Sequence, residues 1–276
     1  MALNSVNTNA SALIALQNLG VTQTDLQATQ NIISTGKKIN TAKDNGAVWS
    51  IAQTMAGKVS ALDAVQDSLN RAQSTIDVAM SAGQQVSDLL TQMKAKVLAA
   101  SDTSLDTTSR TALNEDFKSL RDQITKVVNN ADFNGVNMVK SGGTTVYALA
   151  NDSGSTKMTV AAEDLSLGGP NISLTAAASF NSATTASAFI GVIDSDVTSV
   201  NTALTKLGTG SNALSAHLTF VKSLQDSLTT GISNLVDADM AAESAKLQAL
   251  QTKQQLGVQA LSIANQSTSI MLNLFR

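Results

Sequence analysis

Hydrophobic residues recur every three and four positions over most of the chain, and the longest such run lies between residues 48 and 100. Two lines of positions, each with a spacing of seven, follow this run. The first comprises Val48, Met55, Leu62, Leu69, Ile76, Gly83, Leu90 and Val97. The second comprises Ile51, Lys58, Val65, Ala72, Ala79, Val86, Met93 and Ala100. Because only Gly83 and Lys58 interrupt the apolar pattern, we predict a long helix in coiled-coil packing.

Two shorter runs keep the same spacing. After a polar break at 101–109, one extends from Leu113 to Val127, and another runs from 193 to 235 with Ser211 and Gln225 as polar exceptions. Between 141 and 186 the pattern changes, since glycines separate short β-prone runs. These runs lie at 144–149, 157–160 and 171–174. The sequence therefore predicts a mainly α fold, with long coiled-coil-like helices from both chain ends forming a rod and a small, exposed β-hairpin insert.

The two ends of the chain are nearly free of charge. Residues 1–36 carry only Asp25, and residues 254–275 carry no charged side chain. Both ends nevertheless have an apolar stripe at helical spacing, whereas disordered segments are usually poor in apolar residues. We therefore predict that the ends bury their stripes against each other and against neighbours in an assembly. The predicted assembly interface consists of Leu3, Val6, Leu13, Leu16, Leu19, Leu26, Ile33, Met240, Leu247, Leu250, Leu261, Ala264, Met271 and Phe275.

Composition narrows the class of protein further. Charged residues make up 14 % of the 276 positions, against about 25 % in ordinary soluble domains, and a single proline allows long helices. A net charge of −3 without a basic stripe argues against nucleic-acid binding. No apolar run approaches the ~20 residues of a membrane span, so we expect no membrane insertion. The first residues lack a cleavable-signal pattern, and we expect export without a cleaved signal peptide.

The residue types needed for catalysis are scarce. One histidine, His217, and no cysteine leave no basis for a thiolate metal site or a histidine-dependent triad. Neighbouring carboxylates are better explained as helix caps or hydrated surface than as acid–base pairs. These carboxylates are Glu115 with Asp116, Asp194 with Asp196, and Asp237 with Asp239. We predict that the protein is not an enzyme and has no metal or cofactor.

Three motifs carry a resemblance to a known family. Residues 34–45, read as Ser-Thr-Gly-Lys-Lys-Ile-Asn-Thr-Ala-Lys-Asp-Asn, resemble a signature of the bacterial flagellins. The turn at 133–135, Phe-Asn-Gly, and the C-terminal region from 237–239 to 274–276 are also similar to that family. The resemblance covers about 1–140 and 190–276 in the family's order. Within the first motif it predicts a domain-junction signature of Gly36, Ile39, Asn40, Ala42, Lys43 and Asp44.

The resemblance implies a division of the chain into three parts. Residues 1–40 and 236–276 would form an inner domain whose paired helices line an axial channel. Residues 41–140 and 187–235 would form a helical rod, and 141–186 would be a small β insert in place of a variable outer domain. The neutral polar face of the end helices would then give the channel a wall without charge.

The resemblance also implies a function and partners. The chain would be a structural subunit of the extracellular flagellar filament, a hollow helical tube used for swimming, polymerising with itself and with other flagellins. It would be exported by the flagellar type III apparatus, bind an export chaperone through its C-terminal helix, and contact hook-associated and cap proteins. A homologous hook–filament junction protein is the alternative. Possible O-glycan acceptors are Thr144, Ser153, Thr156, Ser182, Thr184 and Thr185.

Overall fold

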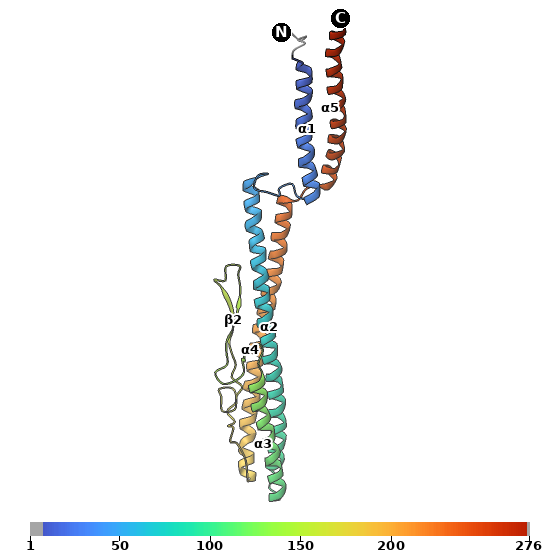
Figure 1. Cartoon of the computed structure of the whole chain (residues 1–276). Coiled ribbons are helices and arrows are strands. Elements are labelled where there is room, and N and C mark those ends of the chain that lie inside the picture. Colours follow the sequence, from blue (N-terminus) through green and yellow to red (C-terminus); the bar gives the residue numbers. More distant parts are fainter. Residues whose placement is uncertain (1–7, 275–276) are drawn as a thin grey trace. The chain divides into compact units, whose positions relative to one another are not determined.

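The computed structural model describes residues 8–274, with side chains up to residue 266. Within this range the fold is mainly helical, as predicted, with one small sheet (Figure 1). The helices are α1 (Ala10–Thr35), α2 (Gly46–Ala100), α3 (Thr107–Asn130), α4 (Ala183–Val236) and α5 (Met240–Leu274). The strands are β1 (Val146–Leu149) and β2 (Lys157–Val160).

The chain divides into two compact units. The terminal unit is drawn from Met1–Gly57 and Ser227–Arg276, and the central unit comprises Lys58–Asp226. Helices α2 and α4 contribute to both units. The division predicted above, with an inner domain at 1–40 and 236–276, remains a prediction about roles in an assembly.

In the central unit α2 and α4 run antiparallel and bury their heptad lines against each other. On α2, the side chains of Ile76, Val86 and Met93 are fully buried, and so are Ile193 and Leu207 on α4. Gly83 belongs to the same seam, because a Cβ at this position would lie 2.7 Å from Cδ2 of Leu204. The predicted coiled-coil pattern is therefore confirmed in this part of α2.

At the start of α2 the predicted second line is wrong. Ile51 is 52 % exposed and Lys58 is exposed, whereas Ala52 is buried and Val59 half-buried. A straight α-helix turns about 20° per heptad relative to a strict spacing of seven. Over the length of α2 this drift moves the buried face by one residue, so that the line extrapolated from the central unit points to solvent here.

Helix α3 is joined to α2 by a short, well-bonded turn. Asp106 begins the helix, because its Oδ1 accepts hydrogen bonds from the backbone N–H groups of Thr108 and Ser109 at 2.8 and 2.9 Å. The Arg110 guanidinium donates to the carbonyl oxygens of Ala100, Asp102 and Leu105 at 2.9–3.0 Å. The first of these bonds satisfies a carbonyl at the end of α2 that has no partner within the helix, and the other two bind carbonyls of the turn between α2 and α3.

The insert contains the predicted hairpin, in which β1 and β2 pair antiparallel from Val146 opposite Val160 to Leu149 opposite Lys157. The hairpin approaches α4 closely. A Cβ on Gly210 would lie 2.7 Å from Cγ1 of Val160, so only a glycine leaves room for the strand. The ring Nε2 of His217 on α4 also lies 2.8 Å from the carbonyl oxygen of Ala150.

The rest of the insert departs from the prediction. The run 171–174 is not a strand, because the backbone N–H groups of Ser173 and Leu174 donate to the carboxylate of Asp196 on α4, at 2.8 and 3.1 Å. Asp196 is only 2 % exposed, and Ile172 and Leu174 are buried as well. The insert is thus held against α4 by a buried carboxylate, instead of being exposed throughout.

Candidate assembly surface on the terminal helices

In the terminal unit, α1 and α5 pair side by side in antiparallel orientation (Figure 1). Leu26 on α1 and Leu250 on α5 are each 7 % exposed and form the centre of the seam. The other predicted interface residues in the seam are half-buried: Leu19, Ile33, Leu247, Leu261 and Ala264. Gly257 allows close approach, since a Cβ there would lie 3.2 Å from Cδ1 of Leu19.

Neutral polar side chains bind the two helices together along the seam. The Asn9 side chain begins α1 by accepting from the N–H of Ala12 at 3.0 Å, and its Nδ2 donates to the carbonyl oxygen of Ala264 at 2.8 Å. Closer to the middle of the pair, Gln254 Nε2 donates to Gln23 Oε1 at 2.8 Å. The pair is therefore held by amides and aliphatic side chains, without an interhelical ion pair among its described residues.

One buried polar group in the seam has no hydrogen bond. Thr29 is fully buried, and its hydroxyl has no partner among the described residues. Neighbouring threonines on α1, such as Thr22 and Thr24, donate instead to a carbonyl four residues earlier. An unsatisfied buried hydroxyl costs about 1–3 kcal/mol, so the isolated pair is less stable than its apolar seam suggests.

Large aliphatic side chains of both helices point away from the seam. Leu13 and Leu16, two predicted interface residues, are 61 % and 55 % exposed, and Met240 is 42 % exposed. The prediction missed further exposed aliphatics on the same helices, which are Ile14, Val21, Leu256, Val258 and Ile263. A prediction based on a strict spacing of seven misses these residues because it follows a single apolar stripe on each helix. The absence of charged residues around them is the signal in the sequence that could have identified them.

Part of this exposed surface forms a groove of about 670 Å³ between α1 and α5. The groove is lined by Ser11, Ile14, Ala15, Asn18, Leu256, Gly257, Ala260, Ile263 and Ala264. None of these described residues carries a charge. Exposed apolar patches on protein surfaces are found at sites that contact other proteins, membranes or ligands. Of the remaining predicted residues, Leu3, Val6 and Phe275 lie outside the described residues, as does the side chain of Met271.

The predicted junction signature connects α1 with α2 and lies against the segment that joins α4 to α5. Gly36 ends α1 with a positive φ of 70°, which glycine adopts without strain. The N–H groups of Lys38 and Ile39 donate to the carbonyl oxygen of Val236 at 2.7 and 3.3 Å, and Ala238 N–H donates to Gly36 O at 2.9 Å. The signature thus ties the end of α1 to the end of α4 and to the segment that precedes α5.

Asp44 organises the rest of the signature. Its Oδ2 accepts from the N–H groups of Thr41 and Asn40 at 2.9 and 3.0 Å, and from the Thr41 hydroxyl at 3.1 Å. These bonds hold the pKa of the Asp44 carboxyl below its ordinary value, and the bond from the Thr41 backbone N–H has the largest effect. Ala42 and Lys43 are exposed in the same turn.

We expect this turn to open at acidic pH. Because the folded pKa of Asp44 is lowered, its stabilising effect is complete above the ordinary value of 3.8 and is lost as the pH falls through the lower folded pKa. An NMR titration of the Asp44 carboxyl should therefore have its midpoint below 3.8, with parallel shifts of the Asn40 and Thr41 amides. Asp44→Asn should abolish those amide shifts. A midpoint at or above 3.8 would contradict this role.

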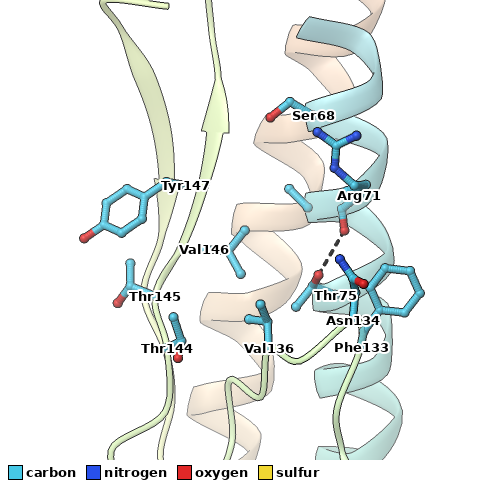
Figure 2. A pocket seen from close by; sticks show the side chains of 11 residues that line it. Ser68, Arg71, Thr75, Phe133, Asn134, Val136, Thr144, Thr145, Val146 and Tyr147 are labelled. Carbon is cyan, nitrogen blue, oxygen red and sulfur yellow. Dashed lines mark hydrogen bonds between the residues drawn. The ribbon is translucent and has the colours of Figure 1, made fainter. Parts of the chain in front are cut away.

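The central unit has a smaller hollow of about 260 Å³ between β1 and α2 (Figure 2). Val146 points into it, whereas Tyr147 points away and is 62 % exposed. Of the described residues that line it, Arg71 alone carries a charge. The hollow therefore lacks an acid–base pair, and no group of three or more His, Asp or Glu side chains that could hold a metal occurs among the described residues.

The paired carboxylates have structural roles. Asp239 Oδ1 begins α5 by accepting from the N–H groups of Ala241 and Ala242 at 2.9 and 3.1 Å. Asp194 forms an ion pair with Lys94 at 2.5 Å. Glu115 and Asp116 form ion pairs with Lys118 and Lys96, both at 2.8 Å.

The described helices include none that is long and apolar enough to cross a membrane.

Comparisons with known proteins agree on one family. The model of the bacterial flagellin N-terminal helical region matches residues 6–144, and that of the C-terminal helical region matches residues 190–275. Flagellin FljM of Caulobacter vibrioides is 58 % identical, with both chains covered completely. A flagellin of Brucella melitensis is 38 % identical, with 99 % of each chain covered.

Two solved structures share the fold. A putative flagellar hook-associated protein from Vibrio parahaemolyticus has a TM-score of 0.58 at 18 % identity, covering 70 % of this chain and all of the other. Bacillus cereus flagellin has a TM-score of 0.50 at 21 % identity, covering 56 % of this chain and 88 % of the other. At such identities the likeness concerns the fold alone.

Proposed function

Because this chain belongs to the bacterial flagellin family and is a structural subunit of the extracellular flagellar filament, we propose that it polymerises through the α1–α5 pair. The observation that carries the proposal is the set of exposed aliphatic side chains on these two helices, which lies around an uncharged groove. Their burial between subunits would yield about 25 cal/mol for each Å² of apolar surface.

The pair also supports the proposed inner domain at 1–40 and 236–276. In this arrangement one face of the pair packs against neighbouring subunits, and the neutral face lines the channel. Gln17, Gln27 and Gln30 on α1 and Gln251 and Gln255 on α5 are exposed and could form such a wall. A wall of amides offers hydrogen bonds to a passing chain without attracting or repelling its charges. The rod would then comprise 41–140 and 187–235, with 141–186 as the insert.

Other flagellins are the partners best supported by the relatives. Caulobacter vibrioides has several flagellins that match this chain over its full length, FljM at 58 % and FljJ at 47 % identity among them. We infer that subunits of this kind can occupy equivalent positions in one filament. Export by the type III route without a cleaved signal peptide, binding of a chaperone by α5, and contact with hook-associated and cap proteins belong to the same proposal.

The function of the surface can be tested by seeded assembly. Purified monomer is mixed with short filament fragments, and the products are followed by sedimentation and negative-stain electron microscopy. Elongation into tubes is the expected result. A protein that binds to fragment ends and stops further growth would instead behave as a junction protein, the alternative that the full-length flagellin relatives do not favour.

We also propose that exposed hydroxyls of the insert and its flank accept O-linked glycans. Thr144, Ser153, Thr156 and Thr184 are exposed. Ser182 and Thr185 are less suitable, because each uses its hydroxyl to accept from the other's backbone N–H, at 3.2 and 3.1 Å, and so begins α4.

The intact mass of native filament protein should therefore exceed that of the bare sequence by whole sugar residues. Peptide mapping should place the added mass on Thr144, Ser153, Thr156 and Thr184. It should leave Ser182 and Thr185 unmodified, since a glycan there would break the bonds that begin α4. The same chain produced without a glycosylation system provides the control. A native mass equal to that of the bare sequence would remove the proposal.

A further inference from the structure

The polar exceptions in the heptad line of α4 are matched by polar residues on α2. Gln225 accepts a hydrogen bond at its Oε1 from Gln66 Nε2, and its own Nε2 donates to Asp63 Oδ1 at 2.6 Å. Ser211 accepts at its hydroxyl from Gln73 Nε2. We call these pairs the 66–225 layer and the 73–211 layer. Both lie within the central unit.

Apolar layers surround both polar layers. Leu62, Val65 and Leu69 on α2 and Leu214 and Val221 on α4 are at most 3 % exposed, whereas the four layer residues are half-buried. When a half-buried amide loses its hydrogen-bond partner, too little water reaches it to replace the lost hydrogen bond fully. Each layer therefore favours arrangements of α2 and α4 in which its two members meet.

A seam of repeated heptads needs such a restriction. Shifting α2 by seven residues against α4 would again bring apolar lines together, because both helices keep the same spacing. Apolar burial alone therefore discriminates weakly between the native register and its neighbours. In coiled coils a single buried polar residue is the best-attested means of fixing register.

The spacing of the two layers makes the native register unique. The α4 members, Ser211 and Gln225, are fourteen residues apart, whereas Gln66 and Gln73 on α2 are seven apart. In what we call the forward slip, α2 is displaced by seven residues so that Gln225 meets Gln73. Ser211 would then meet Met80. In the opposite, backward slip Ser211 would meet Gln66, and Gln225 would meet Val59. Either slip satisfies one layer and leaves the other without a partner.

From this arrangement we propose that the 66–225 and 73–211 layers together select the register of α2 against α4. Neither layer is sufficient alone, since each has a substitute partner one heptad away. Together they exclude both slips. Because the layer residues are spaced differently on the two helices, both layers can pair at once in only one register.

The absence of cysteine from the sequence allows the register to be read by introduced disulfides. Leu204→Cys is combined in turn with one of three cysteines on the same line of α2. Gly83→Cys reports the native register, because the two side-chain positions are adjacent there. Leu90→Cys reports the forward slip, and Ile76→Cys reports the backward slip. Disulfide yield after refolding and mild oxidation is measured by mass spectrometry.

The two single-layer variants should slip in opposite directions. Ser211→Leu removes the layer that the forward slip breaks, while Gln225 still finds an amide partner at Gln73, so the 90–204 disulfide should rise about tenfold while the 76–204 disulfide does not. Gln225→Leu should raise the 76–204 disulfide about tenfold and leave the 90–204 disulfide unchanged. Gln85→Leu with Gln92→Leu, exposed glutamines seven residues apart on the same helix, provides the matched control and should yield the native 83–204 disulfide alone.

Two outcomes would overturn the proposal. The first is exclusive formation of the 83–204 disulfide in both layer variants, with helix content by circular dichroism equal to that of the unaltered protein. The second is an equal rise of both slipped disulfides in either variant, which would indicate general loosening of the seam. If a leucine variant fails to refold, Ser211→Ala and Gln225→Ala remove the same hydrogen bonds at smaller volume and must show the same directions.

Discussion

The Leu16→Asp protein should fold normally and yet fail to form filaments. Leu16 is 55 % exposed on α1, so a carboxylate there is hydrated in the monomer and leaves the seam with α5 intact. In the proposed assembly the same side chain is buried between subunits. Its replacement would forfeit about 1.5–3 kcal/mol of apolar burial and add the desolvation of a charge. At 1.4 kcal/mol per tenfold change, the critical concentration should rise at least about a hundredfold.

Seeded elongation measured by sedimentation provides the readout, together with circular dichroism of the monomer. Ser60→Asp serves as a matched control, since it adds the same charge at an exposed position of α2 in the central unit. This control should elongate at close to the rate of the unaltered protein. Elongation of the Leu16→Asp protein at that same rate would show that this face of α1 stays in water within the filament.

The Leu26→Asp protein should lose both the terminal helix pair and the ability to polymerise. Leu26 is 7 % exposed at the centre of the α1–α5 seam, beside the already unsatisfied hydroxyl of Thr29. The buried and half-buried seam residues that the structure describes carry no positive charge to pair with a carboxylate here, so its burial costs several kcal/mol. The seam would open, while the central unit keeps its own core and remains folded.

Hydrogen exchange should show separately that the α1–α5 seam opens and that the central unit stays folded. Amides of α1 and α5 should lose protection, and amides of α2 and α4 in the central unit should keep it. Leu26→Met offers the matched control, because it keeps the volume and apolar character of the side chain. Filament growth by the Leu26→Asp protein, or unchanged protection of its α1 amides, would contradict a role of this seam in assembly.

The long helices could be predicted from sequence because their packing repeats the same local pattern. Ile76, Val86 and Met93 are buried where the heptads place them. The error at Ile51 and Lys58 has a geometric cause, since a line drawn with a spacing of seven loses the buried face of a straight helix after several turns. The predicted mainly α class and the hairpin at 144–160 did not depend on that detail.

Interactions between distant segments could not be predicted in this way. Asp196 reads as a helix-surface carboxylate beside Asp194, yet it is buried because the backbone of Ser173 and Leu174 meets it there. The candidate assembly surface shows the same limit. Periodicity identified Leu19 and Leu26 in the seam. Which aliphatic side chains stay exposed, including Ile14 and Ile263, depends instead on how much of each helix the seam covers.

The uncharged groove between α1 and α5 has a consequence for the solvent conditions under which filaments persist. Contacts made through apolar surface lose strength on cooling, because their burial carries a large heat-capacity change. Simple salts act by screening charges over about 8 Å at physiological ionic strength, and this groove offers them none to screen. Sulfate, which is excluded from protein surfaces, favours burial instead. Temperature and the structure of water, more than ionic strength, would therefore set the balance between free subunits and polymer.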